Sequence, residues 1–339
     1  MPGADTRLRA RLADVAQQAG VSPATASRVL TGSARVRPET RQQVEAAIAD
    51  LGYVRNRAPR ASAARGTGSI AFMVCEDNAR VFSEPFFPLM LRSVSRELSA
   101  RGIQLVLLTA HSPRDYQIAS RYLRGGHVDG VLLVSMHGKR PLDLRSLGLP
   151  VVLAGRSFGP DEGISYVDAD NAGGARMAVQ YLLKAGRGKV ATIAGPPDMA
   201  PGADRLAGYR SAVSDAGLAD PSLVVFGDFG RMSAAHGLNR LLDRRPAIDA
   251  VFAASDLMAA GALDALRRSG RRVPDDVAVI GFEDSPLAQY TDPKLTTVRQ
   301  PVEAMGARMA QELMALVARG GHEPAQVVLE TELVIRDSA

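Results

Sequence analysis

Residues 12–30 read Leu12-Ala-Asp-Val-Ala-Gln-Gln-Ala-Gly-Val-Ser-Pro-Ala-Thr-Ala-Ser-Arg-Val-Leu30, a pattern typical of two short helices joined by a tight turn. Apolar residues recur at helical spacing from Leu12 onward, and Gly20 supplies the left-handed residue that ends a helix. Ser22 and Pro23 fit the N-cap and first position of a second helix that runs to about Leu30. The sequence therefore predicts a helix-turn-helix, whose second helix fits the major groove of DNA.

A third helix is predicted to begin at Pro38 and to end at Gly52, with four apolar residues on one face: Val44, Ala47, Ile48 and Leu51. The positive charge of the chain is concentrated around these helices. Residues 1–65 hold 11 arginines against 5 acidic residues, a net charge of +6, and because the whole chain carries +5, residues 66–339 carry −1. A basic segment beside a nearly neutral body favours a polyanion partner, here DNA.

Length and composition limit the class of protein. At 339 residues, with 46% hydrophobic and 23% charged residues, the chain suits a globular protein of two or three domains. No apolar run is long enough to cross a bilayer, and the N-terminus lacks the apolar region of a secretory signal. The single cysteine, Cys75, cannot form an internal disulfide. We therefore expect a soluble cytoplasmic protein with no membrane partner.

From Ser69 onward, apolar runs alternate with amphipathic segments of helix length, which is typical of parallel sheets covered by helices on both faces. Nine runs are expected to be strands: 69–75, 103–109, 129–135, 150–154, 164–167, 189–194, 222–226, 250–254 and 277–282. Nine strands are more than a single sheet usually contains, so we expect two sheets. The predicted fold class is thus an α-helical helix-turn-helix headpiece followed by an α/β body of two doubly wound parallel-sheet subdomains.

Several motifs, taken together, resemble the lactose-repressor (LacI) family of transcription regulators. In the N-terminal part they lie at residues 21–30, 36–41 and 51–56. In the body they follow the family's order at 167–174, 205–209, 254–258, 280–284 and 295–298. Within the family, residues 72–77 and 85–88 are most similar to regulators of cello-oligosaccharide or related glucan use.

This resemblance implies a DNA-binding headpiece at 1–56, a hinge helix that orders on DNA at 57–67, and an effector-binding and dimerisation body of periplasmic-binding-protein type at 68–339. The body divides roughly into 68–167 with 297–322 and 168–296 with 323–339, joined by three crossover segments. The implied partners are double-stranded DNA with a pseudo-palindromic operator, a second copy of the chain, and a sugar or oligosaccharide effector. The implied function is repression of carbohydrate-utilisation genes, relieved by that effector.

The resemblance also implies which residues contact DNA. Pro23, Ala24 and Arg28 are placed at base edges. Approach to phosphates is implied for Ser22, Thr25, Ser27, Arg37 and Tyr53. In the hinge, Asn56 caps the helix, and the other implied contacts are Arg57, Arg60 and Ser62.

Three positions depart from the family pattern. Arg11 stands where Thr usually begins the first helix, so that N-cap is lost or comes from another residue. Arg37 stands where Ser or Thr is usual, and it adds a charge where phosphate lies. Ser62 stands where a leucine wedges into the minor groove, and serine cannot unstack a base step. We therefore expect the hinge to depend on Arg57, Arg60 and Arg65 for its affinity.

In the body, the resemblance places seven residues in an effector cleft: Phe86, Arg156, Arg205, Ser255, Asp256, Phe282 and Glu283. A sugar carries many hydroxyls, so its cleft needs charged groups and aromatic faces. The fork of donors on Arg205 suits two adjacent hydroxyls or a carboxylate. Phe86 and Phe282 either stack on a sugar or belong to the core. Gly155 and Ser255 open space that favours an oligosaccharide.

Two other classes of protein stay open: a sugar-binding protein without a DNA-directed role, and a doubly wound α/β enzyme. The string Gly155-Arg-Ser-Phe-Gly159 matches G-x-S-x-G, but a nucleophile elbow requires a helix directly after the serine, and Pro160 and a new strand follow. The five histidines lack metal-ligand spacing, and His127 and His137 are expected to be solvated loop residues. We predict a protein that is not an enzyme and has no catalytic residue, metal or cofactor.

Overall fold

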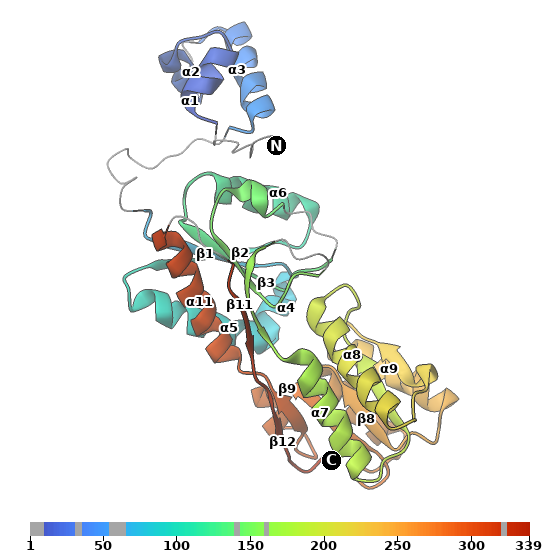
Figure 1. Ribbon diagram of the computed structural model, residues 1–339. Helices are drawn as coiled ribbons and strands as arrows, with labels where there is room; N and C mark the ends of the chain where they lie inside the picture. Colours follow the sequence, from blue (N-terminus) through green and yellow to red (C-terminus); the bar gives the residue numbers. More distant parts are fainter. Residues whose placement is uncertain (1–9, 31–35, 54–65, 139–142, 159–162, 320–323) are drawn as a thin grey trace, which may run out of the picture.

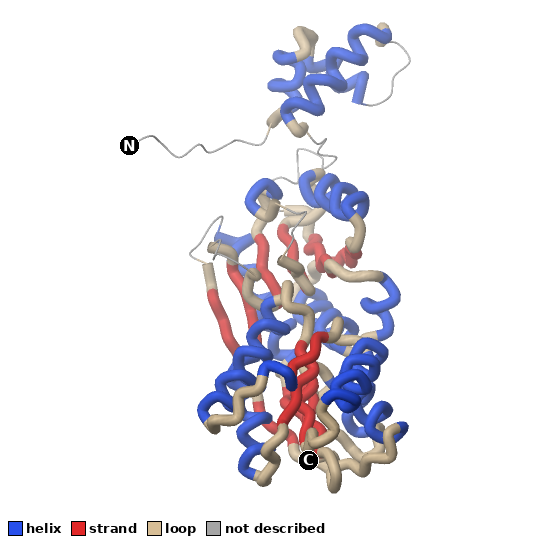
Figure 2. Tube along the Cα trace, turned by 90° about the vertical axis from the view of Figure 1, so that its right-hand side faces the viewer, coloured by secondary structure: helices blue, strands red, loops and turns tan. Residues whose placement is uncertain are grey.

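The computed structural model describes residues 10–30, 36–53, 66–138, 143–158, 163–319 and 324–339 (Figure 1). A small helical unit at the N-terminus lies beyond one end of a larger body made of two sheets (Figures 1 and 2). The predicted hinge residues Asn56, Arg57, Arg60, Ser62 and Arg65 lie outside the described residues. No helix in the described ranges is long and apolar enough to cross a membrane.

The N-terminal unit consists of α1 (Leu12–Gln18), α2 (Pro23–Leu30) and α3 (Pro38–Leu51). These bounds confirm the three predicted helices to within one residue. Their apolar faces share a small core that includes Val15, Ala26 and Val44, each with no exposed surface. Between α1 and α2, Gly20 has a φ of 64°, which glycine adopts without the strain that a Cβ brings. The predicted helix-turn-helix is therefore confirmed.

The first subdomain of the body is a parallel sheet in the order β11-β5-β4-β3-β1-β2. Its strands are β1 (Ser69–Val74), β2 (Gln104–Thr109), β3 (Gly130–Val134), β4 (Val151–Ala154), β5 (Ser165–Ala169) and β11 (Gln326–Leu329). One face packs on α5 (Phe86–Ser99) and α11 (Val302–Arg319), and the other on α6 (Pro113–Arg124) (Figure 1). Alternate residues of β1 go to opposite faces, so Phe72 joins the first core and Met73 the second.

The second subdomain is a sheet in the order β12-β10-β9-β8-β6-β7, parallel except for β12 against β10. Its strands are β6 (Val190–Ala194), β7 (Val224–Phe226), β8 (Ala250–Ala253), β9 (Ala278–Glu283), β10 (Thr296–Arg299) and β12 (Glu332–Val334). Helices α7 (Asn171–Lys184) and α8 (Ala200–Asp215) pack on one face. Helices α9 (Arg231–Arg244) and α10 (Asp256–Arg268) pack on the other.

Four short helical elements complete the described body: α4 (Asn78–Ser83), η1 (Arg145–Leu147), η2 (Pro221–Leu223) and η3 (Pro286–Gln289). The chain passes between the two sheets three times, after β5, after β10 and after β11. Because the crossovers bring the carboxyl ends of both sets of parallel strands together, a ligand site is expected between the sheets.

The strand pairing corrects the predicted subdomain limits. Residue 167 lies inside β5, which belongs wholly to the first sheet, so the first crossover comes after Ala169. The strand β10 pairs with β9 and stays in the second sheet, which moves the limit from 297 to about 300. The strand β11 pairs with β5, so the C-terminal segment returns to the second sheet only at β12, near residue 332 and not at 323.

All nine predicted strands are present, but three further strands were missed: β10, β11 and β12. Each is only three or four residues long, and β11 and β12 lie at sheet edges with alternating half-exposed residues. Such short segments carry little periodicity of their own, because their pairing with β5 and β9 or β10 is what holds them extended.

Candidate functional site

The predicted DNA-contact residues of α2 lie on its outward side. Ser22, Pro23, Ala24 and Arg28 are exposed, while Ala26 and Val29 are buried against the other two helices. This division follows from the helical period, which alternates core and surface within one turn. Thr25 and Ser27 are half-buried at the edge of the same surface. The helix thus presents short polar residues and one arginine, which suits a major groove.

The starts of the three helices are capped in different ways. Ser22 Oγ accepts a hydrogen bond from the Thr25 amide at 3.2 Å, as expected for the N-cap of α2. At α1, the carboxylate of Asp14 accepts from the Arg11 amide at 2.6 Å, so part of the missing threonine cap is replaced by another residue. Arg37 precedes α3 without a side-chain cap and is exposed, and Tyr53 follows α3 half-buried.

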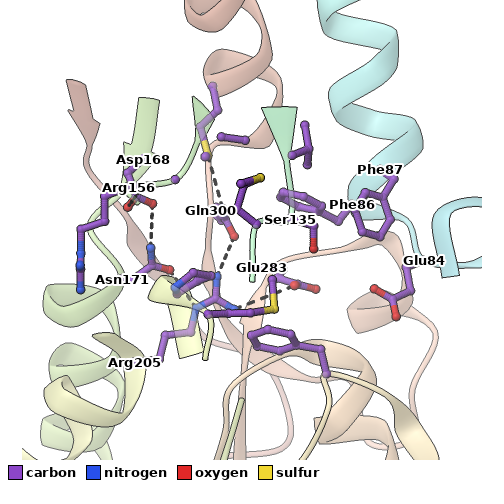
Figure 3. Close-up of a pocket in the computed structure, with 18 of the residues that line it drawn as sticks. Glu84, Phe86, Phe87, Ser135, Arg156, Asp168, Asn171, Arg205, Glu283 and Gln300 are labelled. Carbon is purple, nitrogen blue, oxygen red and sulfur yellow. Dashed lines mark hydrogen bonds and ion pairs between the residues drawn. The ribbon is translucent and has the colours of Figure 1, made fainter. Parts of the chain in front are cut away.

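A cavity lies between the two subdomains, as Figure 3 shows. The space between its walls, including the open mouth, is about 710 Å³. Its walls combine charged, polar, aromatic and aliphatic side chains from both subdomains, including residues of α4, α5, α7, α8 and α11. Among them are Arg80, Glu84, Phe86, Phe87, Ser135, Met136, Arg156, Asp168, Asn171, Met199, Pro201, Arg205, Phe229, Glu283, Gln300 and Met305.

Arg205, on α8, is the most constrained charge in the cavity and is only 3% exposed. It donates to Asn171 Oδ1 at 2.9 Å, to the Ala254 carbonyl at 2.6 Å and to Gln300 Oε1 at 3.0 Å. Its guanidinium also lies 3.8 Å from the centre of the Phe282 ring. Burial lowers the pKa of Arg205 to about 10, and it remains a cation at neutral pH. A guanidinium has five N–H donors, so two are left that no described residue accepts from.

Glu283 lies at the end of β9, with its Oε1 4.0 Å from Arg205 Nη1. Burial raises the pKa of Glu283 to about 8, against the lowering effect of Arg205. Its backbone has a φ of 115°, a strained value for a residue with a Cβ. The next residue, Asp284, forms ion pairs with Arg299 and Arg336 at 2.7 and 2.6 Å, and these hold the strained turn in place.

A second carboxylate, Asp168 on β5, faces the opposite side of the cavity. It accepts from the amides of Arg156 and Ala169 at 3.0 and 2.8 Å and from Asn171 Nδ2 at 2.9 Å. Burial raises the pKa of Asp168, and these amide donors oppose the rise. Because Asn171 donates to Asp168 and accepts from Arg205, the two charges are linked by one fixed amide.

Four of the seven predicted effector residues line the cavity: Phe86, Arg156, Arg205 and Glu283. Figure 3 shows that they come from both sides, with Phe86 opposite Arg156. Arg156, however, directs its guanidinium to Asp204 on α8, with Nε 2.9 Å from Oδ2. Its charge is therefore already paired by the protein, while the residue still lines the cavity.

The other three predicted residues do not line the cavity of the described structure and are buried beside it. Ser255 caps α10 through the Met258 amide and donates to the Phe229 carbonyl at 3.0 Å. Asp256 has no exposed surface and accepts from Thr297 Oγ1 at 2.5 Å and the Ser285 amide at 2.7 Å. Burial raises the pKa of Asp256 to about 7. Phe282 is fully buried beneath Arg205. These residues support the cavity floor.

Several lining residues were missed by the sequence argument. Asp168 and Asn171 lie inside a quoted motif, and their position directly after a predicted strand was a usable signal. Glu84 and Phe87 lie around the start of α5, and Gln300 in a crossover, where no local pattern marks them. Of the two histidines expected to be solvated loop residues, His127 stacks on Tyr122 at 4.8 Å. His137 is hydrogen-bonded to two carboxylates, and its side chain keeps 34% of its surface exposed.

Known proteins that are similar to this chain show which family it belongs to. The model for bacterial regulatory proteins of the lacI family matches residues 11–56, and that for a periplasmic binding protein-like domain matches residues 179–339. The chain is 48% identical to the HTH-type transcriptional regulator CelR of Thermobifida fusca, covering 98% of this chain and 99% of that protein. The chain belongs to the LacI family.

Other relatives of this LacI-family protein agree with that assignment. It is 33% identical to the ribose operon repressor of Halalkalibacterium halodurans over 96% of both chains. The solved structure of a CelR–cellobiose complex matches with a TM-score of 0.80 and 47% identity, covering 98% of this chain and 100% of that one. The LacI-family protein is therefore a DNA-binding transcriptional regulator and not an enzyme, and the two alternative classes are excluded.

Proposed function

We propose that this protein is a repressor of carbohydrate-utilisation genes that leaves its operator when a cello-oligosaccharide, such as cellobiose, fills the cavity between its subdomains. The observation that carries this proposal is the likeness, at 47% identity over 98% of the chain, to a CelR–cellobiose complex. The relatives named as a ribose operon repressor and as the regulator MalR are less similar, at 33% and 34% identity.

The chemistry of the cavity supports a sugar. Glu283, Asp168 and Arg205 offer acceptors and donors in fixed positions, which suits ring hydroxyls that must exchange their water for protein partners. Phe86 and Phe87 add aromatic surface from the first subdomain, and Phe229 adds it beside Arg205, whose guanidinium lies 5.7 Å from its ring centre. A site that pairs every hydroxyl rejects sugars whose hydroxyls point elsewhere, because its buried polar groups are then left unpaired.

We further propose a homodimer that acts in the cytoplasm on a pseudo-palindromic operator. One recognition helix makes few base contacts, so a second copy is needed for useful affinity. On this proposal Pro23, Ala24 and Arg28 meet base edges, and the hinge residues meet the minor groove. Sedimentation as a monomer at micromolar concentration, with and without operator, contradicts the dimer.

The test of the effector class begins with a selection of bound sequences from random DNA. The selected duplex is then titrated with protein by fluorescence anisotropy in the presence of cellobiose, maltose, ribose or cytidine. We expect cellobiose alone to release the protein, and calorimetry to show one site per chain. Release by ribose or cytidine and not by cellobiose overturns the proposed effector, while failure to select any sequence overturns the proposed operator.

A further inference from the structure

The two subdomains contact each other through a corner formed by residues 198–204, which are the end of the loop after β6 and the first residues of α8. Two loops of the first subdomain hold this corner from different sides. One follows β3 and the other follows β4. We name the corner and its partners His137, Gly138 and Arg156 the clasp.

The first half of the clasp is at Asp198. His137 Nδ1 lies 3.0 Å from Asp198 Oδ2, and the Gly138 amide donates to the Asp198 carbonyl at 2.7 Å. The other ring nitrogen of His137 lies 3.3 Å from Glu76 Oε1, which also accepts from Ser135 Oγ at 2.5 Å. His137 therefore bridges a carboxylate of its own subdomain and one of the other subdomain.

The second half is at Asp204. Arg156 approaches it with two parallel donors, Nε to Oδ2 at 2.9 Å and Nη2 to Oδ1. The carboxylate of Asp204 is 22% exposed and the arginine side chain 40% exposed, so the pair is partly shielded from water. Paired bidentate geometry of this kind fixes orientation as well as distance.

The same corner carries part of the cavity wall. Met199 and Pro201 line the cavity and lie between the two aspartates, and Arg205 directly follows Asp204. Separation of the two halves of the clasp moves these three residues away from Phe86 and Ser135 on the opposite wall. The clasp thus acts on the effector site, although neither Asp198 nor Asp204 lines the cavity.

We propose that Asp198 and Asp204 are positioning residues for the effector: by holding the corner against His137, Gly138 and Arg156, they close the cavity and raise effector affinity, more at acidic than at alkaline pH. This assignment rests on the proposed function for the identity of the effector. The contacts of the clasp themselves involve only residues of this chain.

The pH dependence follows from the charges around His137. These are Glu76 at the end of β1, Asp198 on the corner, and Arg80 of α4, which pairs with the other oxygen of Glu76 at 3.2 Å. The hydrogen bonds to Glu76 and then to Asp198 raise the pKa of His137. Glu76 lies in the same subdomain as His137, so only the contribution of Asp198 is lost when the subdomains part. Closure therefore takes up protons, and it weakens as pH rises through the pKa of His137.

The first experiment measures cellobiose affinity by calorimetry for Asp198→Asn, Asp204→Asn and the control Asp215→Asn. Asp215 also forms an ion pair from α8, with Arg176 at 2.8 Å, but that pair lies within the second subdomain. We expect each clasp variant to bind about three- to ten-fold more weakly than the control, as for partly shielded ion pairs. Equal affinity in all three variants overturns the proposal.

A pH profile separates positioning from a merely structural role. Between pH 8 and pH 6, wild-type affinity should rise about two- to five-fold more than that of His137→Gln, since glutamine keeps hydrogen bonds but not the charge. The same profile in both proteins refutes the pH dependence. Titration of Glu283 contributes equally to both proteins and cancels in this comparison.

Hydrogen exchange of the Gly138 amide tests the clasp without any effector. This amide donates across the cleft, so its exchange reports closure directly. It should be faster in Asp204→Asn than in Asp215→Asn. If wild-type protein does not bind cellobiose but this difference is found, the effector class is wrong and the clasp stands; equal exchange rates refute the clasp whatever the effector.

Discussion

Replacement of Arg205 separates its structural role from its part in recognition. Arg205→Ala removes three hydrogen bonds and leaves the oxygens of Asn171, Ala254 and Gln300 without their donor. Loss of one partner from a buried charged network costs about 3–5 kcal/mol, out of a typical 5–15 kcal/mol for a domain. Arg205→Lys keeps a cation near Glu283 but loses the forked set of guanidinium donors, so we expect effector binding to weaken by about 1–3 kcal/mol.

Urea unfolding followed by circular dichroism measures the loss of stability in Arg205→Ala. Calorimetry with cellobiose measures the loss of affinity in Arg205→Lys. The urea midpoint of Arg205→Ala should fall by about 1–2.5 M, given slopes of about 2–3 kcal/mol/M. Arg205→Lys should stay folded and lose at least about ten-fold in affinity. An unchanged midpoint in Arg205→Ala refutes the structural network, and wild-type affinity in Arg205→Lys refutes the role of the fork.

Three further changes test other parts of the molecule. Burial raises the pKa of Glu283 to about 8, so the folded protein binds this proton more tightly than the unfolded chain does, and the free energy of unfolding falls as pH rises from about 4.5 to 8. The Glu283→Gln variant should therefore lose less stability than wild type over that pH range in urea titrations. An equal loss in both proteins contradicts the assignment. Gly208→Ala places a Cβ 2.2 Å from the Ala172 carbonyl of α7, so a destabilisation of about 1–3 kcal/mol is expected, and a wild-type melting temperature contradicts this close packing. Arg28→Ala should weaken specific operator binding by about 1–3 kcal/mol, whereas Arg37→Ala should lower the slope of log affinity against log salt by about 1; anisotropy titrations at several salt concentrations distinguish these outcomes, and an unchanged slope removes Arg37 from the phosphates.

Local patterns in the sequence determined much of this protein. The three helices of the headpiece were predictable because each carries its own period. In addition, α1 and α3 are followed by Gly20 and Gly52, and α2 and α3 begin with a proline. Most of the nine strands were predictable because central parallel strands are buried on both faces and read as apolar runs, and the edge strands β2 and β7 also carry apolar runs. Arg205, Glu283 and Phe86 could be placed in a cleft because they lie in motifs that resemble a known family.

Only the tertiary structure decided the rest. The strands β10, β11 and β12 are too short to be read alone, and they exist because neighbouring strands accept their hydrogen bonds. Likewise, Asp256 and Phe282 could not be told from lining residues, since their distance from the cavity depends on how α10 and β9 pack. The pairing of Arg156 with Asp204 joins residues 48 positions apart on different subdomains. A contact of that kind is set by the approach of two folded units, and no local period in the sequence records it.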